Sequence, residues 1–294
     1  MIKTSAPGSM LMFGEHSVLR GVHAIVFAIN KRIYMEISPR SDDTINIISP
    51  LGQATVCLDN ILVSPPFQYV LQAIKEFPPS TGLDIAITSE MLPTMGFGTS
   101  AAVVVALISG LNILSGKSFN ALFEQSLHVV RKVQGLGSGA DIMASISGGI
   151  GLFKGDTYKP LTTPLKFFAA YYGKKVPTPE VIKHVEERFL NHAELLQKLD
   201  EANDALVLEA TKYLDDAKKL GNLFNLGAGI METFGVHTKD IENFLWELRE
   251  QSHGVKLSGS GLGDCALGIV KNGIYPKNSF PIEISEKGIV FNEL

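Results

Sequence analysis

The stretch PTMGFGTSAAVVVAL, from Pro93 to Leu107, places a proline, two glycines one residue apart and two adjacent hydroxyl residues ahead of an apolar run. Glycine has no Cβ, so another group can approach its backbone closely. The first turn of a helix leaves N–H groups without intrahelical acceptors. The stretch therefore predicts a helix that begins near Thr99 and Ser100 and binds an anion such as a phosphate at its N-terminus.

The two hydroxyl residues allow two interpretations. Thr99 or Ser100 could cap the helix, a role worth about 1 kcal/mol. Alternatively, one hydroxyl could reach a Mg²⁺ ion that is bound to the phosphates, because Mg²⁺ takes oxygen ligands. The stretch alone does not decide between a capped helix end and a phosphate site.

The composition excludes several classes of function. The 294 residues carry a formal net charge of −4, which provides no basic surface for nucleic acid. Apolar residues make up 45% of the chain, as in a well-packed globular protein. No apolar run approaches the roughly 18 residues that suggest a membrane span, and the first residues lack the apolar block of a signal peptide. We expect a cytoplasmic protein without a membrane partner, in which Cys57 and Cys265 are buried free thiols.

Short apolar and β-branched runs, separated by Gly, Pro, Ser and Asp, predict strands in the first half of the chain. They are MLMFG (10–14), HAIVFAI (23–29), YMEIS (34–38), TINIIS (44–49), ATVCL (54–58) and LDIAIT (83–88). Helices are predicted over 66–77 and, from its amphipathic pattern, over 119–133. The first half is therefore expected to be mixed α/β.

The second half has a different pattern. A strand is predicted over 166–173, and residues 178–236 are almost entirely helical in period. A further helix follows Thr238, which is a suitable N-cap, and strands are predicted over 265–270, 281–285 and 287–291. Pro160 and Pro164 bracket a polar link, so we expect two domains that comprise residues 1–160 and 161–294.

Four segments together resemble the GHMP kinases, the family that includes galactokinase, homoserine kinase, mevalonate kinase and phosphomevalonate kinase. In order, they are APGSMLMFGEHSVLRGVHAIVFAI (6–29), PTMGFGTSAA (93–102), VQGLGSGADIMASISGG (133–149) and KLSGSGLGDCALGIV (256–270). They span nearly the whole chain. Within the family, GEH followed by HAIVFAI is most similar to the mevalonate kinase branch.

This resemblance implies an α+β fold of two α/β domains with the active site in the cleft between them. The N-terminal domain would be of the ribosomal-protein-S5-domain-2-like type and the C-terminal domain ferredoxin-like. The implied activity is phosphorylation of a primary hydroxyl by ATP with Mg²⁺, with mevalonate or a similar alcohol as acceptor and 5-phosphomevalonate as the best candidate product. Phosphomevalonate, a sugar, or a catalytically weak nucleotide-binding regulator remain alternatives. A homodimer is common in the family.

The resemblance also implies roles for individual residues. Asp141 matches the catalytic aspartate that takes or orients the proton of the acceptor hydroxyl, although a plain N-cap aspartate is the alternative. Glu15 and His16 would bind the acceptor together with Asp141. The remaining matches form two groups. ATP would be bound by Pro93, Gly96, Phe97, Gly98, Thr99, Ser100 and Ala101, with Ser100 or Thr99 on the metal. The acceptor would also meet the turn of Gly259, Ser260 and Gly261.

Two departures from the family pattern concern charge. The relatives usually have a lysine where this chain has Ser9, and a metal-binding glutamate where it has Val130. The missing positive charge would have to come from another cation, and the candidates in the sequence are Lys31, Arg131, Lys132 and Lys256. Glu124 is a candidate replacement for the metal ligand. Alternatively, Mg²⁺ would rest mainly on the nucleotide and one hydroxyl, as in homoserine-kinase-like members of the family.

Overall fold

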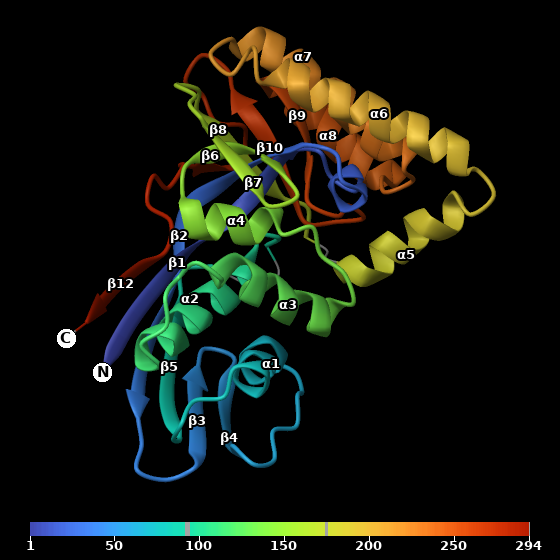
Figure 1. The fold of residues 1–294 in the computed structure, drawn as a ribbon. Helices are drawn as coiled ribbons and strands as arrows, with labels where there is room; N and C mark the ends of the chain where they lie inside the picture. Colours follow the sequence, from blue (N-terminus) through green and yellow to red (C-terminus); the bar gives the residue numbers. More distant parts are fainter. Residues whose placement is uncertain (92–94, 174–175, 294) are drawn as a thin grey trace.

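The computed structural model of the chain describes residues 1–91, 95–173 and 176–293, and Figure 1 shows their arrangement. The strands of the first sheet are β1 (Ile2–Phe13), β2 (Ala24–Pro39), β3 (Thr44–Ser49), β4 (Gly52–Cys57), β5 (Leu83–Ser89), β6 (Ile150–Lys154), β7 (Thr157–Leu161) and β12 (Val290–Glu293). Their order is β12-β1-β2-β5-β3-β4, and β6 pairs with both β2 and β7. Only β3 and β5 form a parallel pair among these described strands.

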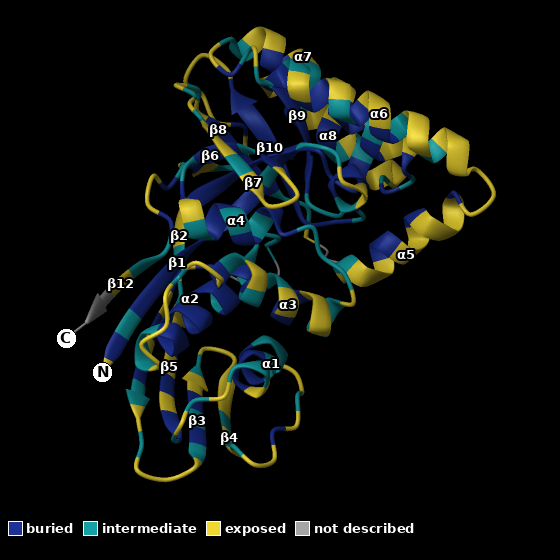
Figure 2. Cartoon of the chain, viewed as in Figure 1, coloured by how far each residue is buried: buried dark blue, intermediate teal, exposed yellow. Residues whose placement is uncertain are grey.

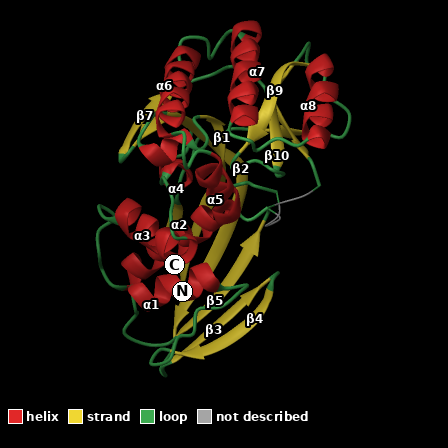
Figure 3. Cartoon of the chain, turned by 90° about the vertical axis from the view of Figure 1, so that its right-hand side faces the viewer, coloured by secondary structure: helices red, strands yellow, loops and turns green. Residues whose placement is uncertain are grey.

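A second, antiparallel sheet belongs to the other half of the chain. Its strands are β8 (Phe167–Tyr171), β9 (Ser252–Ser258), β10 (Cys265–Val270) and β11 (Phe280–Ile282). Their order is β11-β8-β10-β9. Two sheets with their own helices confirm the predicted mixed α+β architecture (Figures 1 and 3).

The helices divide between the two halves. The first half has the 3-10 helix η1 (Ser17–Arg20), α1 (Gln68–Glu76), α2 (Thr99–Leu114), α3 (Leu122–Gln134) and α4 (Ala140–Ser147). The second half has α5 (Thr178–Arg188), α6 (Ala193–Ala210), α7 (Ala217–Thr233) and α8 (Lys239–Gln251). Figure 3 shows α7 and α8 beside β9, and α6 packs against α7, whereas α2 packs against α1, α3 and α4, and both α2 and α4 lie against β1 and β2. The side chain of Thr238 accepts a hydrogen bond from the N–H of Ile241, which confirms the predicted cap of α8.

Helix α2 is the central helix of the first half. It buries residues on nearly every side because β1 covers one side and α1, α3 and α4 cover others (Figure 2). This packing explains why the run after Ser100 is apolar throughout instead of amphipathic. The helix begins where the sequence predicts, and its first residue, Thr99, stands where β1 and the helices meet.

The predicted break between two strands of the first half is wrong. The runs 23–29 and 34–38 form a single strand, β2, that continues through Asn30 and Lys31. These two residues are exposed at the point where the neighbour of β2 changes, because residues 24–27 pair with β6 and residues 33–39 pair with β5. On its other side, β1 pairs with most of the length of β2. Sheet pairing therefore overrides the local polar break in the sequence.

The division into residues 1–160 and 161–294 stays a proposal. Strand β7 belongs to the first sheet and β8 to the second, and β12 pairs with β1 near the N-terminus of the chain.

Cys265 is buried as expected, whereas Cys57 is exposed at the end of β4, so the prediction that both thiols are buried is wrong for Cys57. None of the helices in the described ranges is long and apolar enough to cross a membrane.

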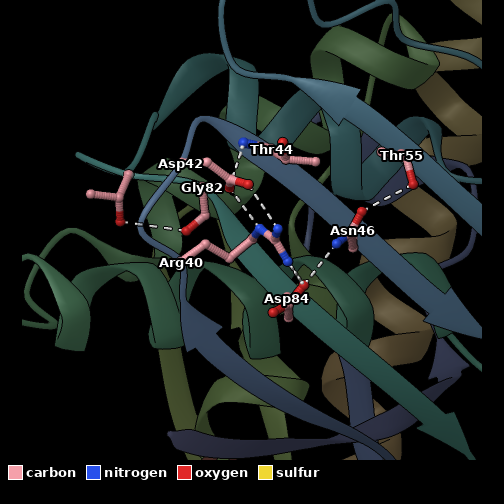
Figure 4. Close-up of polar contacts among 8 residues, drawn as sticks. Arg40, Asp42, Thr44, Asn46, Thr55, Gly82 and Asp84 are labelled. Atoms are coloured by element: carbon pink, nitrogen blue, oxygen red, sulfur yellow. Dashed lines mark hydrogen bonds and ion pairs between the residues drawn. The ribbon is translucent and has the colours of Figure 1, made fainter.

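An exposed polar network orders the outer part of the first sheet (Figure 4). The guanidinium of Arg40, just after β2, donates to Asp42 at 2.7 Å and to Asp84 on β5 at 2.6 Å. Asn46 on β3 also donates to Asp84 at 2.9 Å. These donors lower the pKa of both carboxyl groups, chiefly through the hydrogen bonds from Arg40 to Asp42 and from Asn46 to Asp84. The network ties the turn between β2 and β3 to β5 and so steadies the β3–β4 hairpin.

In the second half, α7 and β9 approach each other closely at a pair of glycines. A Cβ on Gly221 of α7 would lie 2.2 Å from the carbonyl oxygen of His253, and a Cβ on Gly254 of β9 would lie 2.1 Å from the carbonyl oxygen of Gly221. Real Cβ atoms do not approach backbone so closely, so the two elements pack backbone against backbone. Gly229 lies on the same helix with open space around it.

We therefore expect Gly221→Ala to force α7 away from β9 and to lower the free energy of unfolding by about 1–3 kcal/mol or more. The matched control is Gly229→Ala, which gains helix propensity without a clash and raises that free energy by up to about 1 kcal/mol. Urea unfolding followed by circular dichroism measures both. Equal stability of the two variants would contradict the backbone packing.

Candidate active site

A cavity of about 630 Å³ brings together segments from both halves of the chain. The first half contributes the start of α2, the start of α4, Ser9 on β1, and the pair Glu15 and His16. The second half contributes Thr178 at the start of α5 and the turn that follows β9. The cavity also extends along the β3–β4 turn and the start of α1.

At the start of α2, the first N–H groups have no intrahelical acceptor and lie at this cavity. The first intrahelical bond runs from the N–H of Ala102 to the carbonyl of Gly98 at 3.1 Å, so the N–H groups of Thr99, Ser100 and Ala101 precede it. Gly98 is in the left-handed region with φ of +60°. The helix dipole adds about half a positive charge at this end. The geometry is that of an anion site.

The structure bears on one of the two interpretations of the hydroxyl residues, the capping of α2. Gly98 is the N-cap, and no side chain caps α2. The Oγ1 of Thr99 is buried and has no hydrogen-bond partner within the described residues. A buried hydroxyl without a partner costs free energy unless a ligand satisfies it. Capping is therefore excluded for Thr99, and its hydroxyl is available to a group bound in the cavity.

Asp141 lies in the first turn of the second helix at this cavity, α4, whose N-cap is Gly139 with φ of +92°. The alternative of a plain N-cap aspartate is therefore wrong. The hydroxyl of Ser9 donates to Oδ1 of Asp141 at 2.8 Å. Since Ser9 is fully buried, this bond holds the carboxylate in one orientation beside the cavity.

Ser9 also fixes the loop before α2. Its N–H donates to the carbonyl of Phe97 at 3.0 Å, and a Cβ on Gly98 would lie 2.1 Å from its Oγ. Gly96 has φ of +69° and packs against the side chain of Asp264. The glycines are therefore required both by backbone conformation and by the close approach of β1 and of the turn after β9.

The expected replacements for the family lysine and glutamate are not in the cavity. Lys31, Arg131 and Lys132 are exposed, as is Glu124, and Val130 is buried in the core. Lys256 is buried but contacts Glu15 instead of lining the cavity. Among the described residues, none of the side chains that line the cavity is a lysine or an arginine.

Glu15 and Lys256 form a buried ion pair, and Nζ of Lys256 also donates to the carbonyl of Leu257 at 2.6 Å. Burial raises the pKa of Glu15, against the charge of Lys256 and the N–H donors at its carboxylate, which include that of Gly259. Burial likewise lowers the pKa of Lys256, against the charge of Glu15. The pair joins the first motif to the strand that leads into the last motif.

His16 has an unusual backbone conformation for a residue other than glycine, with φ of +60°. Its Nε2 lies 2.7 Å from the carbonyl oxygen of Ser260. Burial lowers the pKa of His16 to about 4, so the ring is neutral at neutral pH. Because a carbonyl only accepts, Nε2 carries the proton and Nδ1 is left as an acceptor. This depressed pKa gives stability that is complete above the ordinary pKa of 6.5 and is lost as the pH falls towards 4.

Most of the residues expected at the site line the cavity, whereas three of them pack behind it. The residues that line it are Glu15, His16, Gly96, Gly98, Thr99, Ser100, Asp141, Gly259 and Ser260. These three are Phe97, Ala101 and Gly261. Phe97 packs against Phe280, the side chain of Ala101 is buried in α2, and Gly261 packs against Val236. Pro93 lies outside the described residues.

Helix α6 holds the segment from Glu15 to Arg20, and sequence patterns did not reveal this. Asn203 donates to the carbonyl of Glu15 at 3.2 Å and to the hydroxyl of Ser17 at 2.9 Å. Arg20 forms a two-point ion pair with Asp200, one turn earlier on the helix. The spacing of these α6 residues places them on one helix face, but nothing in the sequence identifies the partner of that face.

Comparison with known proteins decides the family. The models described as GHMP kinases N terminal domain and GHMP kinases C terminal match residues 67–149 and 207–273. A mevalonate kinase of Archaeoglobus fulgidus is 34% identical, over 98% of this chain and 99% of its own. The chain belongs to the GHMP kinases. It is a small-molecule kinase, and the family implies ATP as the phosphoryl donor.

Two further matches agree with this assignment. A mevalonate kinase of Pyrococcus horikoshii is 30% identical to this GHMP kinase, over 90% of this chain and 87% of its own. The crystal structure of the Methanococcus jannaschii mevalonate kinase superposes with a TM-score of 0.81 at 22% identity, and the match covers 97% of this chain and 98% of that one. The latter shows a shared fold over nearly the whole length.

We expect Gly98→Ala to weaken nucleotide binding by about tenfold or more, because the added methyl meets Ser9 and displaces the start of α2. Gly116→Ala is the matched control: Gly116 has nearly the same φ, +61°, but open space around it. It suffers the same backbone strain and keeps its affinity. Titration with a fluorescent ATP analogue measures both, and equal affinity of the two variants would contradict the packing of Gly98 on Ser9.

Proposed function

We propose that this GHMP kinase transfers the γ-phosphate of ATP to the primary hydroxyl of mevalonate and forms 5-phosphomevalonate, an isoprenoid precursor. One observation carries the proposal: a carboxylate, Asp141, oriented by Ser9, faces the same cavity as the anion-binding start of α2. An in-line transfer needs the phosphate and the acceptor hydroxyl held side by side. The cavity offers both positions.

The triphosphate would bind at the start of α2, where the N–H groups of Thr99, Ser100 and Ala101 donate to its oxygens. The base would follow the extension of the cavity between Leu51 in the β3–β4 turn and Tyr69 at the start of α1. Side chains with apolar bodies line this part, which suits a flat base. The network around Arg40 steadies the hairpin that carries the β3–β4 turn.

Mg²⁺ is expected with the nucleotide, and the residues present fit it. The unpartnered Oγ1 of Thr99, with Ser100 beside it, offers an oxygen ligand at the position of the phosphates. The described residues contain no group of three His, Cys, Asp or Glu side chains that could hold a metal by itself. This agrees with an ion held mainly by phosphate oxygens and water, which would neutralise charge during the transfer.

Asp141 would accept the proton of the attacking hydroxyl or orient that hydroxyl towards the γ-phosphate. The hydroxyl of Ser9 occupies one lone pair of Oδ1 and keeps the carboxylate in place. His16, which is neutral with a free acceptor at Nδ1 in this tautomer, would receive a hydrogen bond from a hydroxyl of the acceptor. The chain's own groups thus position the acceptor and manage its proton.

The choice of acceptor rests on the relatives. The two curated relatives reported above are both named mevalonate kinase. The cytoplasmic location, the homodimer and the absence of a nucleic-acid partner stay predictions of the sequence.

The test is an assay of ADP release with Mg-ATP and, in parallel, mevalonate, phosphomevalonate and galactose. We expect turnover with mevalonate, and we expect Asp141→Asn to lower kcat by about 10²–10⁴-fold with ATP affinity unchanged. Asp156→Asn, in the exposed β6–β7 turn, is the control and keeps full activity. Turnover with another alcohol alone would refute the substrate, and near-normal kcat of Asp141→Asn would refute the role of Asp141.

A further inference from the structure

The ion pair between Glu15 and Lys256 is unusual because both partners are almost completely buried. Lys256 is 1% exposed and Glu15 is 3% exposed. Taking two charges out of water is costly, so a buried pair is weak evidence for stability and calls for another reason. The position of the pair indicates a role at the cavity, because Glu15 directly precedes His16 and Lys256 lies three residues before Gly259.

The fold makes room for this lysine. Gly227 lies in the interior of α7, where glycine costs about 1 kcal/mol relative to alanine. A Cβ on Gly227 would lie 3.3 Å from Cδ and 3.4 Å from Cε of Lys256, so the aliphatic stem runs directly over the glycine. The helix thus has a residue of low helix propensity at the position that contacts the lysine stem.

The carboxylate of Glu15 is used by the protein itself. It accepts from Nζ of Lys256, and the backbone N–H groups of Glu15 and Gly259 lie near enough to lower its pKa against the effect of burial. Its backbone carbonyl is held by Asn203 of α6. The residue that the family resemblance assigns to the acceptor therefore has its charge matched by Lys256, which lies on β9 just before the turn at Gly259 and Ser260.

The same turn fixes His16. The carbonyl of Ser260, the residue after Gly259, accepts the Nε2 proton of His16 at 2.7 Å. The ring also packs against Phe234, with ring centroids 5.5 Å apart. Any shift of the Gly259–Ser260 backbone moves the group that sets which nitrogen of His16 carries the proton.

We propose that Glu15 and Lys256 are positioning residues: their ion pair fixes the turn at Gly259 and Ser260, and that turn holds His16 in the tautomer and orientation that bind the acceptor. The proposal rests on the function proposed above for its kinetic readout. It assigns Glu15 to the support of the site and leaves His16 as the group that touches the acceptor. ATP phosphates bind elsewhere in the cavity, at α2, so the pair acts on the acceptor alone.

The experiment compares Lys256→Met, Glu15→Gln and the double variant, with Lys212→Met as the control. Lys212 pairs with Glu209 on the surface, so the same substitution there removes an exposed ion pair. For each variant, kcat and both KM values are measured, and ¹⁵N-labelled histidine spectra report the tautomer and pKa of His16. The histidine spectra do not depend on which alcohol is the substrate.

We expect Lys256→Met to raise the KM for mevalonate by roughly 10–100-fold and to change the KM for ATP less than about twofold. The His16 spectrum should lose its single Nε2–H tautomer and titrate closer to the ordinary pKa of 6.5. The double variant should recover about tenfold or more of the lost affinity, because it leaves no unpaired buried charge. Lys212→Met should change nothing.

If Lys256→Met does not fold, Glu15→Gln carries the same test, because a buried lysine can lose its proton when its partner is neutral. An unchanged His16 spectrum in both single variants would overturn the proposal. So would equal rises in the KM for ATP and for mevalonate, or a large loss in Glu15→Gln that is absent in Lys256→Met. Failure of the wild type to use mevalonate would refute the proposed substrate, while the histidine spectra would still decide the role of the pair.

Discussion

The packing of the loop before α2 against Ser9 of β1 is the constraint on which the site depends. Ser9 packs so closely against Gly98 that no side chain fits there. Its N–H donates to the carbonyl of Phe97, and its hydroxyl donates to Asp141. The nearby carbonyl of Pro7 accepts from Ser145 of α4 at 2.8 Å. Because the starts of α2 and α4 are both anchored to β1, the anion site and the carboxylate have a fixed separation.

The side of the cavity that we propose for the acceptor is built by contacts between the two halves of the chain. Helix α6 grips the segment around η1 through Asp200 and Asn203, and the pair of Glu15 and Lys256 links that segment to β9. A site made this way exists only when both halves are folded and docked. The close packing of α7 on β9 therefore contributes to function, because β9 carries Lys256 and leads into the turn at Ser260.

The sequence predicts well what local physics decides. The glycines and hydroxyls before α2, the cap at Thr238 and the aspartate after a glycine-rich loop are encoded within a few residues of one another. What it cannot supply are pairings between distant segments: Ser9 and Asp141 are 132 positions apart, and Glu15 and Lys256 are 241 apart. The continuous strand β2 is also set by its neighbours, since its polar centre alone indicates a break. In the sequence, Ser9 in place of the family lysine indicates only the loss of a positive charge. In the fold, its hydroxyl orients the carboxylate of Asp141.

The most direct test of this arrangement is a crystal structure with a non-hydrolysable ATP analogue and mevalonate. We expect the terminal phosphates at the N–H groups of Thr99, Ser100 and Ala101, and the primary hydroxyl of mevalonate about 2.6–3.2 Å from the carboxylate of Asp141. A triphosphate bound away from the start of α2, or an acceptor hydroxyl out of reach of Asp141, would contradict it.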